Sequence, residues 1–189
     1  MEAFAVSAIA VALGEIGDKT QLLALMLAMR FRRPWPIITG ILVATLLNHT
    51  IAGAIGSWIR SAVTPDALKW LLAASFLGVA VWSLRADSPD DEAPVATHLG
   101  VFAVTAVAFF FAEMGDKTQI ATLMLAARFE SLTAVVAGTT LGMLAADAPV
   151  VFAGNLAADR IPFKAIRIAA ASLFAALGIW VLIAGVPTS

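Results

Sequence analysis

The sequence contains no cysteine among its 189 residues, which excludes both a disulfide framework and a thiolate metal site. Charge is also scarce, because only 13% of the residues are charged whereas 61% are hydrophobic. With a mean hydropathy of +0.93, the chain is too apolar for a soluble domain, and it is predicted to be an integral membrane protein. The formal net charge is -1 and no basic cluster is present, which argues against a nucleic-acid partner.

Six apolar segments are each long enough to cross a bilayer, which requires about 20 mostly apolar residues. They lie near 4–29, 36–59, 66–84, 99–127, 132–157 and 164–185. The first segment lacks the positively charged start and the cleavage pattern of a signal peptide, so it is predicted to be a helix. The predicted fold class is an all-α membrane protein with six transmembrane helices.

The chain repeats itself. EIGDKTQLLALMLAMRF at 15–31 recurs as EMGDKTQIATLMLAARF at 113–129, with twelve of the seventeen positions identical. The repeat predicts a first three-helix unit at 1–86, an acidic linker at 87–98 and a second three-helix unit at 99–189. Three spans are an odd number, so the second unit enters the membrane from the opposite side. The two units therefore form an inverted repeat, an architecture in which transporters bind ions near the midplane.

The distribution of Lys and Arg outside the repeated segments predicts the orientation. Seven lie on one side of the predicted spans (Arg30, Arg32, Arg33, Arg85, Arg160, Lys164 and Arg167) and three on the other (Arg60, Lys69 and Arg128). Because cytoplasmic loops carry the excess of positive charge, the first side is predicted to be cytoplasmic. Both termini would then lie outside the cytoplasm.

The repeated segments place charges inside predicted spans, at Glu15, Asp18 and Lys19 and again at the equivalent positions 98 residues later. An unpaired charge at the bilayer centre costs about 2.5 to 3.5 kcal/mol, so such residues face the protein interior and usually mark an ion path. At about 100° per residue these three side chains share one helix face with Gln21. Thr20 points away unless the helix bends at Gly17.

Four carboxylates and two carboxamides would surround one point if the two faces meet. The predicted metal ligands are Glu15, Asp18, Gln21, Glu113, Asp116 and Gln119. Oxygen ligands suit Mg²⁺, Ca²⁺ or Mn²⁺, and the absence of cysteine argues against Cu(I) and less firmly against Zn²⁺. The four carboxylates and the two lysines sum to -2, which one divalent ion or about two protons would neutralise, as ion exchange requires.

Further polar residues are predicted to support this site: Lys19, Thr20, Lys117, Thr118, Asp147 and His49. The lysines could pair with the glutamates at i,i+4 and act as counter-charges or gates. His49 and Asp147 occupy equivalent repeat positions and could act as proton acceptors, although a hydrogen-bonded contact beside Asn48 accounts equally well for His49. The structural alternative is a buried salt-bridge network that locks the two halves together.

The doubled signature Glu-x-Gly-Asp-Lys-Thr resembles that of the Gdt-type family of Golgi and bacterial membrane proteins. Its residues are Glu15, Gly17, Asp18, Lys19 and Thr20, and again Glu113, Gly115, Asp116, Lys117 and Thr118. The resemblance covers the whole chain and implies Mn²⁺ or Ca²⁺ transport in exchange for protons, with the acidic motif residues as ligands. For a bacterial member it implies manganese export across the inner membrane. Which of the two ions is the main cargo does not follow from the motif.

Two other classes of function fit parts of the pattern. A small exporter of cationic organic solutes, of the lysine-exporter type, has a similar size and internal duplication. An intramembrane aspartyl protease needs two aspartates that share one proton, but a lysine beside each aspartate favours ionising both. The chain is therefore predicted not to be an enzyme and to need no cofactor; its predicted partners are a divalent ion, protons and the lipid bilayer. The oligomeric state stays open.

Overall fold

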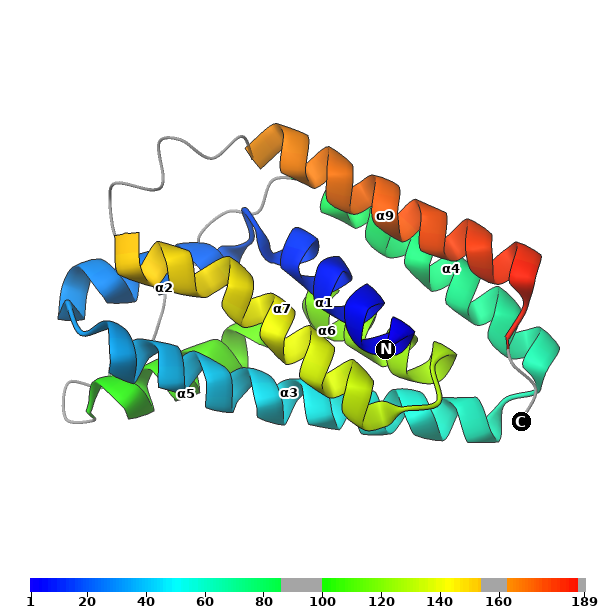
Figure 1. The fold of residues 1–189 in the computed structure, drawn as a ribbon, viewed down its shortest axis with the longest axis horizontal. Helices are drawn as coiled ribbons and strands as arrows, with labels where there is room; N and C mark the ends of the chain where they lie inside the picture. The colour runs from blue at the N-terminus through cyan, green and yellow to red at the C-terminus, as the bar shows by residue number, and fades with distance from the viewer. Residues whose placement is uncertain (86–99, 154–162, 187–189) are drawn as a thin grey trace.

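The computed structural model describes residues 1–85, 100–153 and 163–186, and all regular elements in these ranges are helices (Figure 1). In chain order they are α1 (Glu2–Glu15), α2 (Lys19–Phe31), α3 (Pro34–Ala62), α4 (Pro65–Ser83), α5 (Val101–Glu113), α6 (Lys117–Arg128), α7 (Leu132–Ala153) and α9 (Phe163–Ala184). The prediction of an all-helical protein is confirmed. The predicted linker at 87–98 and the predicted end of the fifth span at 157 lie outside the described residues.

Four of the described helices are long and apolar enough to cross a membrane: α3, α4, α7 and α9. They correspond to the predicted second, third, fifth and sixth spans. The predicted first and fourth spans are wrong as continuous helices, because each is divided at its charged motif. α1 ends at Glu15 before α2 begins at Lys19, and α5 ends at Glu113 before α6 begins at Lys117.

Glycine and aspartate produce these two breaks. Gly17 has a φ of 85° and Gly115 has a φ of 80°, in the left-handed region that side chains other than glycine rarely adopt. The next residue, Asp18 or Asp116, has an extended backbone and caps the helix that follows. Each motif therefore ends one helix and begins another, and its glutamate and aspartate are buried.

The helices of the two repeats pack against each other in a reciprocal manner. α1 lies against α7, α3 lies against α5 and α6, and α4 lies beside α9 (Figure 1). Phe76 of α4 and Phe174 of α9, which are equivalent in the repeat, are both completely buried in one hydrophobic cluster. The first helix of each repeat, α1 or α5, thus packs on the first long helix of the other repeat, α7 or α3, and this arrangement brings the two motifs into the same interior.

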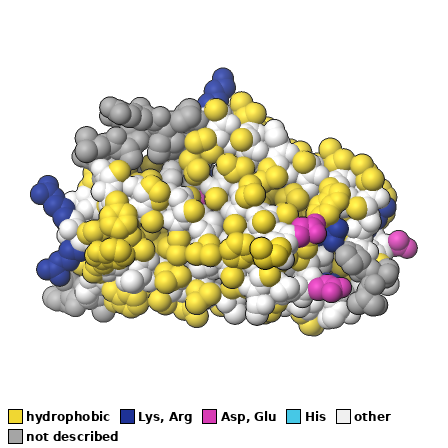
Figure 2. Space-filling view, in the orientation of Figure 1, with side chains coloured by type: hydrophobic (Ala, Val, Ile, Leu, Met, Phe, Trp, Pro, Cys, Tyr) yellow, Lys and Arg dark blue, Asp and Glu magenta, His cyan; other side chains and the backbone are white. Residues whose placement is uncertain are grey.

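The surface agrees with a membrane environment. Apolar side chains are spread across the whole face in Figure 2. Large apolar residues such as Leu47, Phe111 and Ile183 are exposed at the surface. Basic side chains gather on this face at the end where α2 meets α3. Apolar exposure on this scale is typical of helices that contact lipid.

Glycines permit the closest helix contacts. A Cβ atom on Gly56 of α3 would lie 2.1 Å from the backbone oxygen of Leu123 in α6, and one on Gly142 of α7 would lie 2.4 Å from that of Ala8 in α1. Small residues of this kind allow backbones to approach in membrane proteins. These contacts hold the helices that carry the motifs.

Replacing Gly56 by Ala is expected to destabilise the protein by about 1 to 3 kcal/mol, because the methyl group meets rigid backbone. Gly78→Ala in α4 is the matched control, since a Cβ there meets nothing within 4 Å. The control should be neutral or stabilising, because alanine favours a helix over glycine by about 0.5 to 1 kcal/mol. Thermal melting of both variants in detergent measures the difference, and equal midpoints would contradict the packing argument.

Candidate functional site

The aspartates of the two motifs hold the starts of α2 and α6. The Lys19 backbone N–H donates to Asp18 Oδ1 (2.7 Å), and the Lys117 backbone N–H donates to Asp116 Oδ1 (2.6 Å). Both helices thus direct their N-terminal ends, which carry a partial positive charge, at the motif loops. The second carboxylate oxygen of each aspartate is left for other contacts.

Each lysine pairs with the aspartate of the other repeat. Lys117 Nζ lies 3.1 Å from Asp18 Oδ2, and Lys19 Nζ lies 3.7 Å from Asp116 Oδ2. The Lys117 side chain is only 3% exposed, whereas that of Lys19 is 26% exposed. These two pairs join residues of different repeats, whereas the sequence suggested pairing with glutamate at i,i+4. The two ion pairs therefore connect the two halves of the chain at the motifs.

The two motif glutamates are completely buried and are bound by threonine. The Thr20 hydroxyl donates to Glu15 Oε1, and the Thr118 hydroxyl donates to Glu113 Oε1 (3.0 Å). Thr20 would point away from Glu15 on a continuous helix, so this contact depends on the break at Gly17. The threonines therefore orient the carboxylates in both halves.

The two glutamines fix the motif loops. Gln21 Oε1 accepts from the Gly17 N–H (2.9 Å), and Gln119 Oε1 accepts from the Gly115 N–H (2.7 Å). Both were predicted as metal ligands, and the same oxygens serve here to hold the backbone of the break. Gln21 Nε2 also donates to the Ala146 carbonyl on α7 (3.2 Å), so the loop is tied to the opposite repeat.

Asn48 is a site residue that the sequence reasoning did not assign. Its Oδ1 accepts from Gln119 Nε2 (3.3 Å), and its Nδ2 donates to the Phe110 carbonyl (2.9 Å). Position 48 is equivalent to position 146 in the repeat. The glutamine of each motif therefore donates to the equivalent residue of the opposite repeat, Asn48 or Ala146. The available signal was an amide side chain in the middle of an apolar segment, next to His49.

His49 and Asp147 are both completely buried, one against each motif. His49 Nε2 lies 3.5 Å from Glu113 Oε2, within ion-pair distance. Asp147 follows Ala146, whose carbonyl accepts from Gln21 Nε2, so it lies at the first motif. Neither carboxylate oxygen of Asp147 has a hydrogen-bond partner among the described residues. The structure thus joins the two motifs by ion pairs, with His49 within reach of Glu113 and Asp147 next to the residue that binds Gln21.

The spacing of the acidic and histidine side chains bears on metal binding. Within residues 1–85, 100–153 and 163–186, no group of three or more Asp, Glu or His side chains is close enough to hold a metal ion as it stands. The lysine ammonium groups occupy positions next to the aspartates instead.

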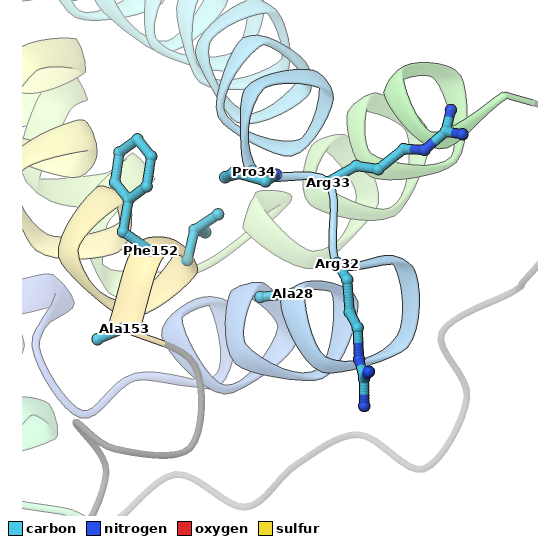
Figure 3. Close-up of a pocket in the computed structure, with 7 residues that line it drawn as sticks. Ala28, Arg32, Arg33, Pro34, Phe152 and Ala153 are labelled. Carbon is cyan, nitrogen blue, oxygen red and sulfur yellow. The ribbon is translucent and has the colours of Figure 1, made fainter.

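A separate hollow of about 250 Å³ lies where the end of α2 meets the start of α3 and the end of α7 (Figure 3). Arg32 and Arg33 line it, but their side chains point away from each other and from Phe152. No motif residue lines this hollow. It is therefore distinct from the candidate ion site.

Charged groups buried where two broken helices meet inside an apolar helical protein define a membrane transporter. A model of the divalent cation/proton antiporter GDT1 matches the chain twice, over residues 3–91 and 101–189. The chain therefore belongs to the GDT1 family of divalent cation/proton antiporters, and it carries two repeats of the family domain. The resemblance inferred from the doubled motif is confirmed, and the match favours an antiporter over an exporter of organic solutes.

Curated relatives agree with this assignment. A protein of Vibrio cholerae serotype O1 with the name "Putative manganese exporter" is 50% identical over 175 residues, which cover 92% of this chain and 87% of the relative. "GDT1-like protein sll0615" of Synechocystis is 28% identical, with 92% and 93% covered, and "GDT1-like protein 5" of Arabidopsis thaliana is 26% identical, with 88% and 89% covered. No solved structure matches the chain.

Proposed function

We propose that this protein exports Mn²⁺ in exchange for protons, through a site formed by the carboxylates of both motifs. The observation that carries the proposal is the burial of Glu15, Asp18, Glu113 and Asp116 at two broken helices, one from each repeat. Carboxylates in this setting are expensive to bury without a cation. A transported ion supplies that cation in one half of the cycle, and protons supply it in the other.

The charge of the site supports exchange. The four motif carboxylates and two lysine ammonium groups sum to -2, so one divalent ion and about two protons give the same loaded charge. A purely structural salt-bridge network explains the two aspartates, which pair with Lys117 and Lys19. It does not account for Glu15 and Glu113, which are completely buried in the same interior and accept hydrogen bonds from threonine hydroxyls.

Manganese is favoured over calcium by the Vibrio cholerae relative, whose name refers to manganese export and which shares half of its aligned residues with this chain. Carboxylate oxygens bind both Mn²⁺ and Ca²⁺. Calcium is the competing cargo in the test.

We further propose the six-span inverted repeat as the working architecture, with 1–86 and 99–189 as its halves and 87–98 as the linker. The α1–α2 and α5–α6 pairs each count as one broken span, which agrees with sites at interrupted helices in other transporters. The excess of Lys and Arg at one end supports a bacterial inner-membrane protein with both termini outside the cytoplasm.

Purified protein in proteoliposomes tests the function directly. A pH gradient of the correct sign should accelerate Mn²⁺ flux, and each Mn²⁺ should be accompanied by counter-movement of about two protons. Ca²⁺, Mg²⁺ and Zn²⁺ are compared under the same gradient, and a radiolabelled basic amino acid tests the organic-solute alternative. Proton-independent Mn²⁺ flux would overturn the antiport proposal, and gradient-driven uptake of the amino acid alone would favour the exporter class.

A further inference from the structure

The two halves of the site differ at one pair of equivalent positions. Position 49 carries histidine and position 147 carries aspartate, although the residues around them are related by the repeat. The residue before each is bound by the glutamine of the opposite motif: Gln119 binds Asn48, and Gln21 binds the Ala146 carbonyl. These contacts set His49 against the second motif and Asp147 against the first.

Because of this difference, charge is distributed unequally between the two halves of the site. Lys117 and Lys19 each pair with an aspartate, and His49 lies 3.5 Å from Glu113 Oε2. By the repeat, Asp147 takes the place that His49 has beside Glu113, and the contact of Gln21 with the adjacent Ala146 carbonyl ties it to the first motif, where it adds a second carboxylate to that of Glu15. One half thus presents a carboxylate with a basic partner, and the other presents two carboxylates together.

No ion pair among the described residues includes Glu15 or Asp147. Both side chains are 0% exposed, and three of their four carboxylate oxygens have no hydrogen-bond partner in the described part of the chain. Only Glu15 Oε1 is bound, by the Thr20 hydroxyl. Buried carboxylate oxygens without partners are costly, and a cation that binds them removes that cost.

We infer that the divalent cation binds off-centre, between Glu15 and Asp147, and that Asp147 is a ligand supplied by α7 in addition to the motif residues. This inference rests on the proposed function and refines its site. The two negative charges of the pair equal the charge of one divalent ion. In the other half His49 stands at the position equivalent to Asp147, so that half lacks the second carboxylate. The pseudo-symmetric site therefore binds one ion and not two.

Mn²⁺ binding to detergent-purified protein tests the inference without transport. The free Mn²⁺ signal in electron paramagnetic resonance measures the dissociation constant. Asp147→Asn should weaken binding at least about tenfold, a loss of about 1.4 kcal/mol, whereas Asp66→Asn, which removes an exposed aspartate in the first turn of α4, should stay within about threefold of the unmodified protein. Size-exclusion profiles and melting curves establish that each variant folds.

A charge swap provides the decisive comparison. His49→Asp combined with Asp147→His moves the acidic pair to Glu113, and it should restore binding to within about threefold, whereas Asp147→His alone should not. A purely structural role of Asp147 would not be rescued in this way. If Asp147→Asn does not fold, the comparison of the double variant with Asp147→His tests the inference.

The outcomes separate the two proposals. Normal Mn²⁺ affinity in Asp147→Asn, or a folded swap that binds no better than Asp147→His, overturns the off-centre site while Glu15→Gln and Asp18→Asn still lose binding. If those two motif variants also bind Mn²⁺ normally, the proposed carboxylate site itself is wrong.

Discussion

Mn²⁺ transport is expected to fall at least about tenfold in each of four variants that keep the shape of a motif side chain but remove its charge. They are Glu15→Gln, Asp18→Asn, Glu113→Gln and Asp116→Asn. Asparagine can still cap α2 or α6, because its side-chain oxygen accepts the same backbone hydrogen bond. The loss should therefore reflect the missing charge and not a lost helix start. Flux into proteoliposomes at saturating pH gradient measures it.

Asp66→Asn is the matched control for the aspartate variants, because Asp66 is an exposed residue in the first turn of α4. It should transport normally. Thr20→Ala and Thr118→Ala should have milder effects, since each removes one hydrogen bond to a glutamate that keeps its charge. Near-normal transport in all four carboxylate variants, with the proteins folded, would place the ion site elsewhere.

Lys117→Met is expected to change the coupling between manganese and protons, and not only the affinity. The unmodified motif site has a charge of -2 and should exchange one Mn²⁺ for about two protons without net charge movement. Removing one ammonium group makes the site more negative by one, so flux should become voltage-dependent or the proton-to-manganese ratio should depart from two. Lys19→Met should behave alike but more weakly, because Lys19 is more exposed and lies farther from its aspartate.

The measurement is Mn²⁺ flux at clamped membrane potential, with valinomycin and potassium setting the voltage and a trapped dye reporting protons. Lys69→Met on α4 is the control for the loss of a lysine outside the motifs. An unchanged ratio in both motif variants would mean that the lysines are passive counter-charges. Strong voltage dependence without proton movement in the unmodified protein would indicate a uniporter or channel.

The meeting of the two motifs could be predicted from the sequence because the signal is doubled. A single Glu-x-Gly-Asp segment in an apolar stretch has many explanations, but its recurrence at an offset of 98 residues requires a shared structural reason. The repeat also placed His49 and Asp147 at matching positions. Those inferences needed only residue spacing.

The breaks in the first and fourth segments could not be predicted with the same certainty, because glycine has two uses in membrane helices. Gly56 and Gly142 lie within regular helix and admit a neighbouring backbone, whereas Gly17 adopts a positive φ and ends one. Nothing in a glycine itself distinguishes these cases. The partners of the lysines were equally hidden, since each lies about a hundred residues away in the other half.

The crossed pairs of Lys19 with Asp116 and Lys117 with Asp18 mean that each half of the chain contributes one partner to each ion pair. A free-standing three-helix unit would leave its own lysine and aspartate without the partners they have here. Only a second copy, arranged reciprocally, would supply them. Covalent fusion of two such copies fixes that partnership at a ratio of one to one, and it frees the two copies to diverge. Histidine in one half and aspartate at the matching place in the other is a divergence that a dimer of identical subunits could not hold.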